Sequence, residues 1–185
     1  DTGKIGGNAA SDDFSLGGLN METEKLFYQD AYLRETTAKV VECRQGKHGY
    51  EIVLDRTCFY PEGGGQPGDH GTLNGIQVTD THEKDGLVLH DAKEPIKVGT
   101  EVKAVIDWDR RFDLTQQHSG EHMVSGVVHR IYGYDNVGFH MGADMVTIDF
   151  SGELTEQQLR DVEQEVNEKI WLDSPVKCWY PSPEE

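Results

Sequence analysis

Short runs in which apolar and polar residues alternate fill the chain from Leu26 to Asp109. A period of two in segments rich in β-branched residues is typical of strands whose two faces differ in burial. Turn-forming pairs separate several of the runs, and residues 45–49 are the expected hairpin loop between the first two. The expected strands cover residues 36–43, 50–55, 71–73, 76–82, 87–90 and 101–107. Their spacing predicts a small antiparallel barrel or sandwich.

The hydrophobic period changes to that of a helix beyond Trp108. Val124, Val127, Val128 and Ile131 recur at helical intervals, which predicts a helix from about residue 110 to residue 132. Residues 145–150 alternate like a strand, and residues 176–180 are a further candidate. The capping box at residues 155–158 opens a last helix, whose expected buried stripe consists of Leu159, Val162, Val166 and Ile170.

Composition narrows the class of protein. The 185 residues are 36% hydrophobic and 28% charged, as in a soluble globular chain that can bury a core. No apolar run approaches the roughly 20 residues of a membrane span, and no secretory signal is visible, so no membrane partner is expected. Cys43, Cys58 and Cys178 are odd in number and widely spaced. This pattern predicts no disulfide framework and a reducing, cytoplasmic location.

The net charge of −17 argues against general affinity for nucleic acids, and DNA is not an expected partner. Phosphate contacts require clustered Lys and Arg. An acidic protein can still bind RNA through a local basic patch. Four residues that flank the first predicted helix could make phosphate contacts: Arg110, Arg111, His129 and Arg130. A solvated helix end is an equally good interpretation of these residues.

His118 and His122 are four residues apart on the first predicted helix, so they lie on one face, one turn apart. Their imidazoles can converge on one metal ion, and zinc is the usual occupant of such a pair. Two polar residues on a solvated face are the alternative interpretation. A metal site needs at least one further ligand, and the downstream residues of suitable type are His129, His140 and Cys178.

The same segment, from His118 to His122, fits the H-x-x-E-H pattern of inverted zinc peptidases. In those enzymes the glutamate activates the zinc-bound water, which makes Glu121 a candidate catalytic base. The match is only five residues long. It also belongs to enzymes with a large two-lobed scaffold, for which this chain has no room.

Gly63, Gly64, Gly65 and Gln66 form a dense glycine loop bracketed by two prolines. Consecutive glycines remove side chains, so a ligand can approach the backbone closely. A flexible turn is the alternative, but the density of the run and its central amide predict a shaped substrate site. The loop matches neither a P-loop nor a dinucleotide fingerprint. Thr57, close by in the sequence, is a candidate hydroxyl for the same site.

Taken together, these segments resemble the AlaX-type trans-editing proteins, relatives of the editing domain of alanyl-tRNA synthetase. The resemblance covers residues 26–185 in order, and each motif is weak alone while their order and spacing are specific. The motifs are Phe59-Tyr60-Pro61 with the glycine loop, Asp69-His70-Gly71, residues 107–111, residues 117–122, Gly138-Phe139-His140, and Asp149-Phe150 leading into the last helix.

The resemblance implies a small N-terminal antiparallel β-barrel, expected at residues 21–110, and an α+β editing domain at residues 111–185. In that domain, which threonyl-tRNA synthetase shares, helices pack on an antiparallel sheet. Residues 1–20 are Gly-, Asp- and Ser-rich and are expected to be a flexible or vector-derived leader. The family carries two more zinc ligands in a C-x-x-x-H motif beyond a segment like residues 178–185. This sequence lacks that motif, so the editing domain is expected to be incomplete.

The implied activity is that of a free-standing, zinc-dependent enzyme that hydrolyses the ester joining serine or glycine to alanine tRNA. His118 and His122 are then zinc ligands, while the glycine loop and Gln66 contact the terminal adenosine and carbonyl. The Thr57 hydroxyl is expected to help recognise serine. Glu121 is a candidate base on its chemistry alone, because the family does not require an acid there.

Two other functions remain open at this point: a zinc peptidase that uses Glu121, and a non-catalytic module that binds tRNA or the synthetase. The sequence contains no nucleotide-activating motif, so neither ATP binding nor ligase activity is predicted. Nothing in it indicates an oligomeric state.

Overall fold

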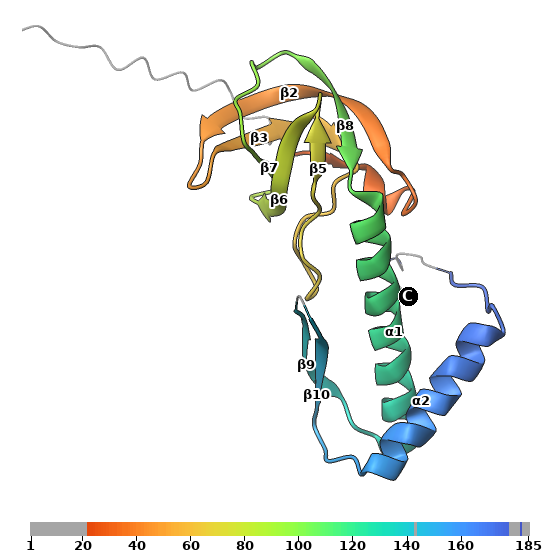
Figure 1. The fold of residues 1–185 in the computed structure, drawn as a ribbon. Helices are drawn as coiled ribbons and strands as arrows, with labels where there is room; N and C mark the ends of the chain where they lie inside the picture. The colour runs from red at the N-terminus through yellow and green to blue at the C-terminus, as the bar shows by residue number, and fades with distance from the viewer. Residues whose placement is uncertain (1–21, 143, 178–181, 183–185) are drawn as a thin grey trace, which may run out of the picture.

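The computed structural model describes residues 22–142, 144–177 and 182, and its fold is α+β (Figure 1). A closed barrel of antiparallel strands forms one end of the molecule, with the strand order β2-β3-β7-β6-β5-β8. The sequence pattern left a barrel and a sandwich open, and the structure is a barrel. Its strands are β2 (Glu35–Gln45), β3 (Tyr50–Leu54), β5 (Gly71–Leu73), β6 (Ile76–Lys84), β7 (Leu87–Ala92) and β8 (Glu101–Ile106).

Two tight turns fix the register of three barrel strands. Asn74 and Gly75 have φ angles of 50° and 85°, and Asp85 and Gly86 have φ angles of 52° and 79°. Two-residue hairpins need positive φ at both positions, which Asn-Gly and Asp-Gly adopt readily. The flanking residues pair directly, Leu73 with Ile76 and Lys84 with Leu87. The predicted turn residues therefore lie where the chain reverses.

The barrel interior is apolar except for a small buried polar group around His90. This side chain is fully buried, with Nδ1 2.9 Å from the carbonyl oxygen of Ile52 and Nε2 2.8 Å from Oγ1 of Thr57. A carbonyl oxygen only accepts, so Nδ1 donates and Nε2 accepts from the threonine hydroxyl. Burial in the apolar barrel lowers the pKa of His90 to about 4. The surrounding core includes Val40, Ile52, Leu54, Leu73, Val78 and Val102.

A short parallel pair lies beside the barrel. β1 (Glu24–Lys25) pairs with β4 (Arg56–Thr57), and the one-turn 3-10 helix η1 (Leu26–Tyr28) follows β1 directly. The loop after η1 leads to β2 past the beginning of the long helix α1 (Trp108–Tyr132). This arrangement brings an N-terminal segment next to a helix about 80 residues further along the chain.

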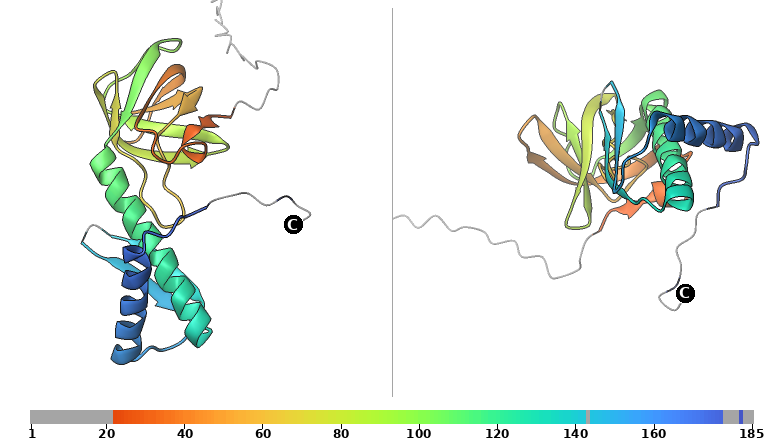
Figure 2. Two further views of the ribbon diagram at one scale, coloured as in Figure 1. Left: turned by 90° about the vertical axis from the view of Figure 1, so that its right-hand side faces the viewer. Right: turned by 90° about the horizontal axis from the view of Figure 1, so that it is seen from below.

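Helix α1 leaves the barrel and supports the second half of the fold (Figures 1 and 2). Asp107 caps its start by accepting from the backbone N–H of Arg110 at 3.2 Å, and Gly133 ends it with φ of 71°. Strands β9 (Asn136–Met141) and β10 (Val146–Phe150) pair antiparallel. Helix α2 (Glu156–Trp171) carries the predicted capping box and packs on α1 through Val127, Val128, Val162 and Val166.

The structure of this half differs from the sequence prediction at three places. Strand β9 was not predicted. Of the expected stripe on α2, Val162 and Val166 are buried, but Leu159 and Ile170 are 48% and 53% exposed, because only part of that face meets α1. Val176 and Lys177 form no strand, and the rest of the predicted strand at 176–180 lies outside the described residues, as does the predicted leader.

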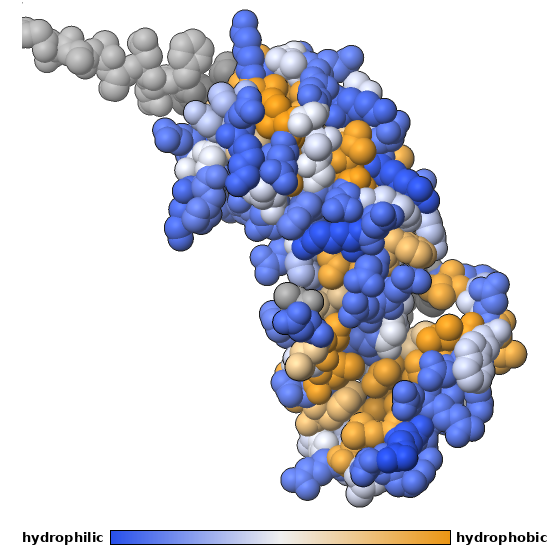
Figure 3. Space-filling view, viewed as in Figure 1, coloured by the Kyte–Doolittle hydropathy of each residue, from blue (hydrophilic) through white to orange (hydrophobic). Residues whose placement is uncertain are grey.

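Apolar side chains remain exposed over this part of the molecule (Figure 3), among them Ile131, Val137, Met145, Leu159 and Ile170. None of the helices in the described part of the chain is both long and apolar enough to span a bilayer.

Acid is expected to destabilise the fold through His90. Its folded-state pKa of about 4 lies below the ordinary 6.5, so between these values the unfolded chain binds a proton that the folded chain does not. The stability contributed by neutral His90 is complete above about pH 6.5 and is lost as the pH falls toward 4. From pH 7 to pH 5 the free energy of unfolding should fall about 2 kcal/mol more than in the His90→Gln variant, measured by urea denaturation. Equal pH slopes for the two proteins would contradict this.

Candidate functional site

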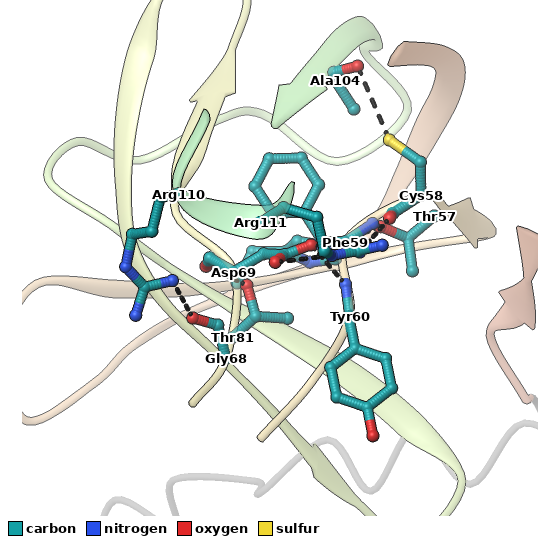
Figure 4. Close-up of polar contacts among 11 residues, drawn as sticks. Thr57, Cys58, Phe59, Tyr60, Gly68, Asp69, Thr81, Ala104, Arg110 and Arg111 are labelled. Carbon is teal, nitrogen blue, oxygen red and sulfur yellow. Dashed lines mark hydrogen bonds and ion pairs between the residues drawn. The ribbon is translucent and has the colours of Figure 1, made fainter. Parts of the chain in front are cut away.

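A buried ion pair holds the end of the glycine loop against the first turn of α1 (Figure 4). Asp69 and Arg111 are 1% and 4% exposed. The Arg111 Nε atom donates to Oδ1 of Asp69 at 2.9 Å, and its Nη2 atom donates to Oδ2 of Asp69 and, at 3.0 Å, to the carbonyl oxygen of Cys58. A planar guanidinium that donates to both carboxylate oxygens fixes orientation as well as distance.

Further hydrogen bonds complete this connection. Asp69 accepts from the backbone N–H of Tyr60 at 2.8 Å through Oδ2, and its carbonyl oxygen accepts from the Thr81 hydroxyl at 2.8 Å. Arg110 donates from Nη1 to the carbonyl oxygen of Gly68 at 2.8 Å (Figure 4). No buried side-chain N or O atom among the described residues lacks a hydrogen-bond partner. The loop and the helix therefore behave as one unit.

These contacts bear on the four candidates for phosphate contacts, for which a solvated helix end was the alternative. Arg111 is buried and paired with Asp69, so it cannot meet a phosphate. Arg130 pairs with Glu165 at 2.5 Å, and the His129 Nδ1 atom lies 3.0 Å from Asp135.

The histidine pair lies on α1 directly beside the glycine loop. The His118 and His122 rings stack with centroids 4.9 Å apart and an interplanar angle of 21°. His118 Nδ1 lies 2.9 Å from Oε1 of Gln66. An amide oxygen only accepts, so Nδ1 carries the proton, and the lone pair of His118 is on Nε2. The structure thus brings together Gln66 and the histidine pair, which are about 50 residues apart in the sequence.

The glycines allow the loop to lie between His118 and strand β9. A Cβ atom on Gly65, whose φ is 80°, would be 2.5 Å from the ring of Phe139, and that ring is 5.2 Å from the His118 ring. A Cβ atom on Gly64, with φ of 59°, would be 3.5 Å from Cε1 of His118. Gly65 is therefore needed for close packing on β9, and both positions favour glycine by their backbone conformation.

Glu121 is the buried member of a small hydrogen-bond network beside the histidine pair. Its side chain is 4% exposed, and Oε1 accepts from the Ser125 hydroxyl at 2.5 Å and from Nδ2 of Asn136 at 2.6 Å. Its other oxygen, Oε2, is 3.3 Å from Nδ1 of His122, whose side chain is 74% exposed. Both histidines thus face an oxygen through Nδ1, one from Gln66 and one from Glu121.

The donor atoms suit a metal ion. One donor atom each from His118, Glu121 and His122 lies within 4.8 Å of the others. Burial, and after it the neighbouring His122, lowers the pKa of His118, against the opposing effect of Glu121. A lowered pKa favours the neutral imidazole that a metal requires. The imidazole nitrogens of His118 and His122 would fit two positions of a tetrahedral zinc site. A second group of similar type, Glu51, His82 and Asp91, lies on the barrel, where Glu51 is paired with Arg44 at 2.5 Å.

The structure does not bring Thr57 to this site. Thr57 is fully buried in the barrel, where its oxygen bonds His90 and also accepts from the backbone N–H of Phe59 at 3.1 Å. Of the downstream ligand candidates, His129 and His140 are exposed and Cys178 lies outside the described residues. Sequence reasoning missed Asn136 and included Phe139 only as part of a family motif, because both reach the site from β9, the strand that it did not predict.

Comparison with known proteins places this chain in a family. The model of tRNA synthetases class II (A) matches residues 4–110. AlaX-L, an alanyl-tRNA editing protein of Pyrococcus horikoshii, is 44% identical over 83% of this chain. AlaX-M of the same organism is 46% identical over 64% of it, and the alanyl-tRNA editing protein Aarsd1 of Bos taurus is 38% identical over 80%.

The chain therefore belongs to the class II (A) family of tRNA synthetases. Its similarity to alanyl-tRNA editing proteins runs through both the barrel and the half that carries the histidine pair. The alignments cover 40%, 54% and 36% of the lengths of these three relatives, so the chain spans about half of them or less.

Removing one member of the buried ion pair is expected to destabilise the protein strongly. Arg111→Met leaves the Asp69 carboxylate buried without its partner, which costs about 3–5 kcal/mol in comparable pairs. Arg130→Met is the matched control, because the Arg130 side chain is 59% exposed and such surface pairs contribute about 0–1 kcal/mol. Urea denaturation measures both. A loss of less than about 1 kcal/mol in Arg111→Met would show that the connection does not depend on this pair.

Proposed function

We propose that this chain hydrolyses the ester between serine or glycine and alanine tRNA, as a zinc-dependent editing protein. The names of the relatives support the reaction class, since AlaX-L, AlaX-M and Aarsd1 are all alanyl-tRNA editing proteins. The observation that carries the proposal is the matched pair of contacts at His118 and His122, each of which faces an oxygen through Nδ1. A cytoplasmic location, with Cys43 and Cys58 free, is part of the same proposal.

His118 and His122 would hold the zinc ion through their Nε2 atoms. When bound, zinc supplies Lewis acidity that can polarise a water molecule or the ester carbonyl. Metal-bound histidines commonly donate their other N–H to a carboxylate or an amide oxygen, which fixes the tautomer and the orientation of the ring. Gln66 and Glu121 provide such oxygens, for Nδ1 of His118 and of His122 respectively. A complete tetrahedral site requires further ligands beyond the two histidines.

The glycine loop is the proposed surface for the aminoacyl end of the tRNA. Gln66 and His118 line a pocket of about 180 Å³ with Phe27, Tyr28 and Tyr60. While the Gln66 oxygen accepts from His118, its amide nitrogen can donate to a carbonyl in this pocket. Gly65 packs against Phe139, so Gly63 and Gly64 are the positions at which a ligand could approach the backbone closely. Thr57 has no part in this proposal, because the barrel encloses its hydroxyl.

Glu121 serves in this proposal as a positioning residue and not as the base expected from its sequence motif. A general base must reach the proton that it removes. Glu121 is buried, one oxygen accepts two hydrogen bonds, and the other faces His122. The same contacts give little support to a peptidase of the H-x-x-E-H type, in which the glutamate must face the attacking water.

Replacing Glu121 by glutamine is expected to weaken zinc binding about 10- to 100-fold, because the charge that orients His122 is removed at nearly constant size. Competition with a chromophoric chelator at pH 7 measures the dissociation constant. Asp113→Asn removes an exposed charge from the same helix and should leave the constant unchanged. Equal zinc affinity in the wild type and Glu121→Gln would exclude the positioning role.

Purified protein with zinc in excess is expected to release serine from mischarged alanine tRNA above the buffer rate, and chelation should abolish the release. His118→Ala and His122→Ala should each lower the rate on the order of 100-fold or more, because each removes a metal ligand. His129→Ala alters an exposed histidine of the same helix and is the control that should retain activity.

The alternatives give different results in this assay. Binding of tRNA without release of serine, at saturating zinc, would indicate the non-catalytic module. Peptide cleavage that is lost in Glu121→Gln would indicate the peptidase and overturn the role given to Glu121, whereas undiminished deacylation in that variant would count against the peptidase.

A further inference from the structure

Two adjoining pockets form one aromatic groove along α1, which starts at the proposed site. The smaller pocket, of about 180 Å³, contains Gln66 and His118. The larger, of about 790 Å³, lies toward the barrel end of α1. They share Ala31 and Thr115 in their linings, so they lie next to each other along α1. The groove lies between α1 and the loop after η1, and residues 173–176 form a further wall of the larger pocket. The aromatic residues of the groove are Phe27, Tyr28, Tyr32, Tyr60, Trp108 and Phe112.

The aromatic rings of the larger pocket form a contiguous surface. Trp108 and Phe112, one helical turn apart, stack with centroids 5.5 Å apart, and the Tyr32 ring is 5.9 Å from that of Trp108. The Arg34 guanidinium lies 4.5 Å from the centroid of Trp108. Tyr32 and Phe112 are 68% and 37% exposed, so their rings are accessible to a ligand. Exposed aromatic rings beside an arginine are a recurring platform for unpaired bases.

Charge distinguishes the groove from the rest of the surface. Acidic residues make up 34 of the 185 residues of the chain. Among the residues that line the two pockets, Asp173 is the one carboxylate. An acidic protein that binds a polyanion needs such a stretch of surface, because each carboxylate near a phosphate opposes binding.

We propose that this groove binds the single-stranded 3′ end of the tRNA, with the terminal aminoacyl-nucleotide beside Gln66 and His118 and the preceding bases on Tyr32 and Phe112. The proposal rests on the proposed function and adds the mode of binding. Phe112 and His118 are six residues apart on α1, or roughly 9 Å. At about 3.4 Å for each stacked nucleotide, this length accommodates two to three bases.

Stacking rather than phosphate neutralisation is the source of affinity in this groove. Arg111, the arginine in the lining of the groove, is committed to Asp69, and Arg34, over the Trp108 ring, is the other cation nearby. Single-stranded binding loses affinity with salt at a slope of about −0.7 for each neutralised phosphate. The logarithm of the binding constant should therefore fall with the logarithm of the salt concentration at a slope between 0 and about −1.5.

The test is binding of a fluorescent RNA oligonucleotide that ends in CCA and carries no amino acid, followed by anisotropy. Tyr32→Ala and Phe112→Ala should each weaken binding roughly 5- to 100-fold, because each removes one stacking partner. Tyr32→Phe and Phe112→Tyr keep the rings and should bind like the wild type. Ile131→Ala is the control for an exposed apolar residue on the same helix outside the groove.

Unchanged affinity in both alanine variants, or a salt slope steeper than about −3, would overturn the proposal. Failure of the RNA to bind, with concentration-dependent dimerisation that Phe112→Ala abolishes, would overturn it in favour of a second copy of the chain as the occupant. The assay requires no hydrolysis. Deacylation that is unaffected by the groove variants would therefore refute the groove alone, whereas binding through the groove without deacylation would refute the proposed reaction alone.

Discussion

The arrangement of the site depends on one buried contact, the ion pair of Asp69 and Arg111. The barrel and α1 are stiff elements, and the glycine loop that lies between them has few side chains of its own to hold it. Arg111 attaches the first turn of the helix to the end of that loop. His118 follows seven residues later, so its position relative to Gln66 is set by a rigid length of helix. Burying two charges is costly, and the additional hydrogen bonds from Tyr60 and to Cys58 offset that cost.

The histidine pair is also held by side-chain contacts between residues of different elements. Gln66 comes from the barrel loop, Glu121 from α1 itself and Asn136 from β9, so three elements fix two imidazoles. The loop can reach His118 because Gly65 permits contact with Phe139 that any Cβ atom would prevent. The glycines thus have a packing role beside the one expected from ligand approach. Because the contacts converge from separate elements, a change in any one of them moves the imidazoles.

Local patterns predicted most of the elements, and contacts between distant residues explain what they missed. The Asn74-Gly75 and Asp85-Gly86 turns act within four residues, so their position could be read directly from the chain. The partner of Arg111 could not be predicted from the chain, because Asp69 is 42 residues away and many other acidic residues were equally plausible partners. β9 was missed because its residues, Asn136–Met141, show no clear alternation and pair with β10 alone. Leu159 and Ile170 repeat like a buried stripe, yet burial depends on what α2 meets and not on its own period.

The chain is strongly acidic, yet its proposed substrate is an RNA, which is a polyanion. The contacts of the arginines on α1 bear on how such a chain could bind RNA. Arg110, Arg111 and Arg130 are engaged with protein groups, so the start and end of α1 provide no cluster of free cations. Attraction for a polyanion must then come from groups that do not depend on charge, and the aromatic groove along α1 is such a surface. Bases are available for stacking only where they are unpaired, as at the 3′ end of a tRNA. The proposed groove would favour single strands over duplexes without reading any sequence, because it offers little to a phosphate backbone and much to an exposed base.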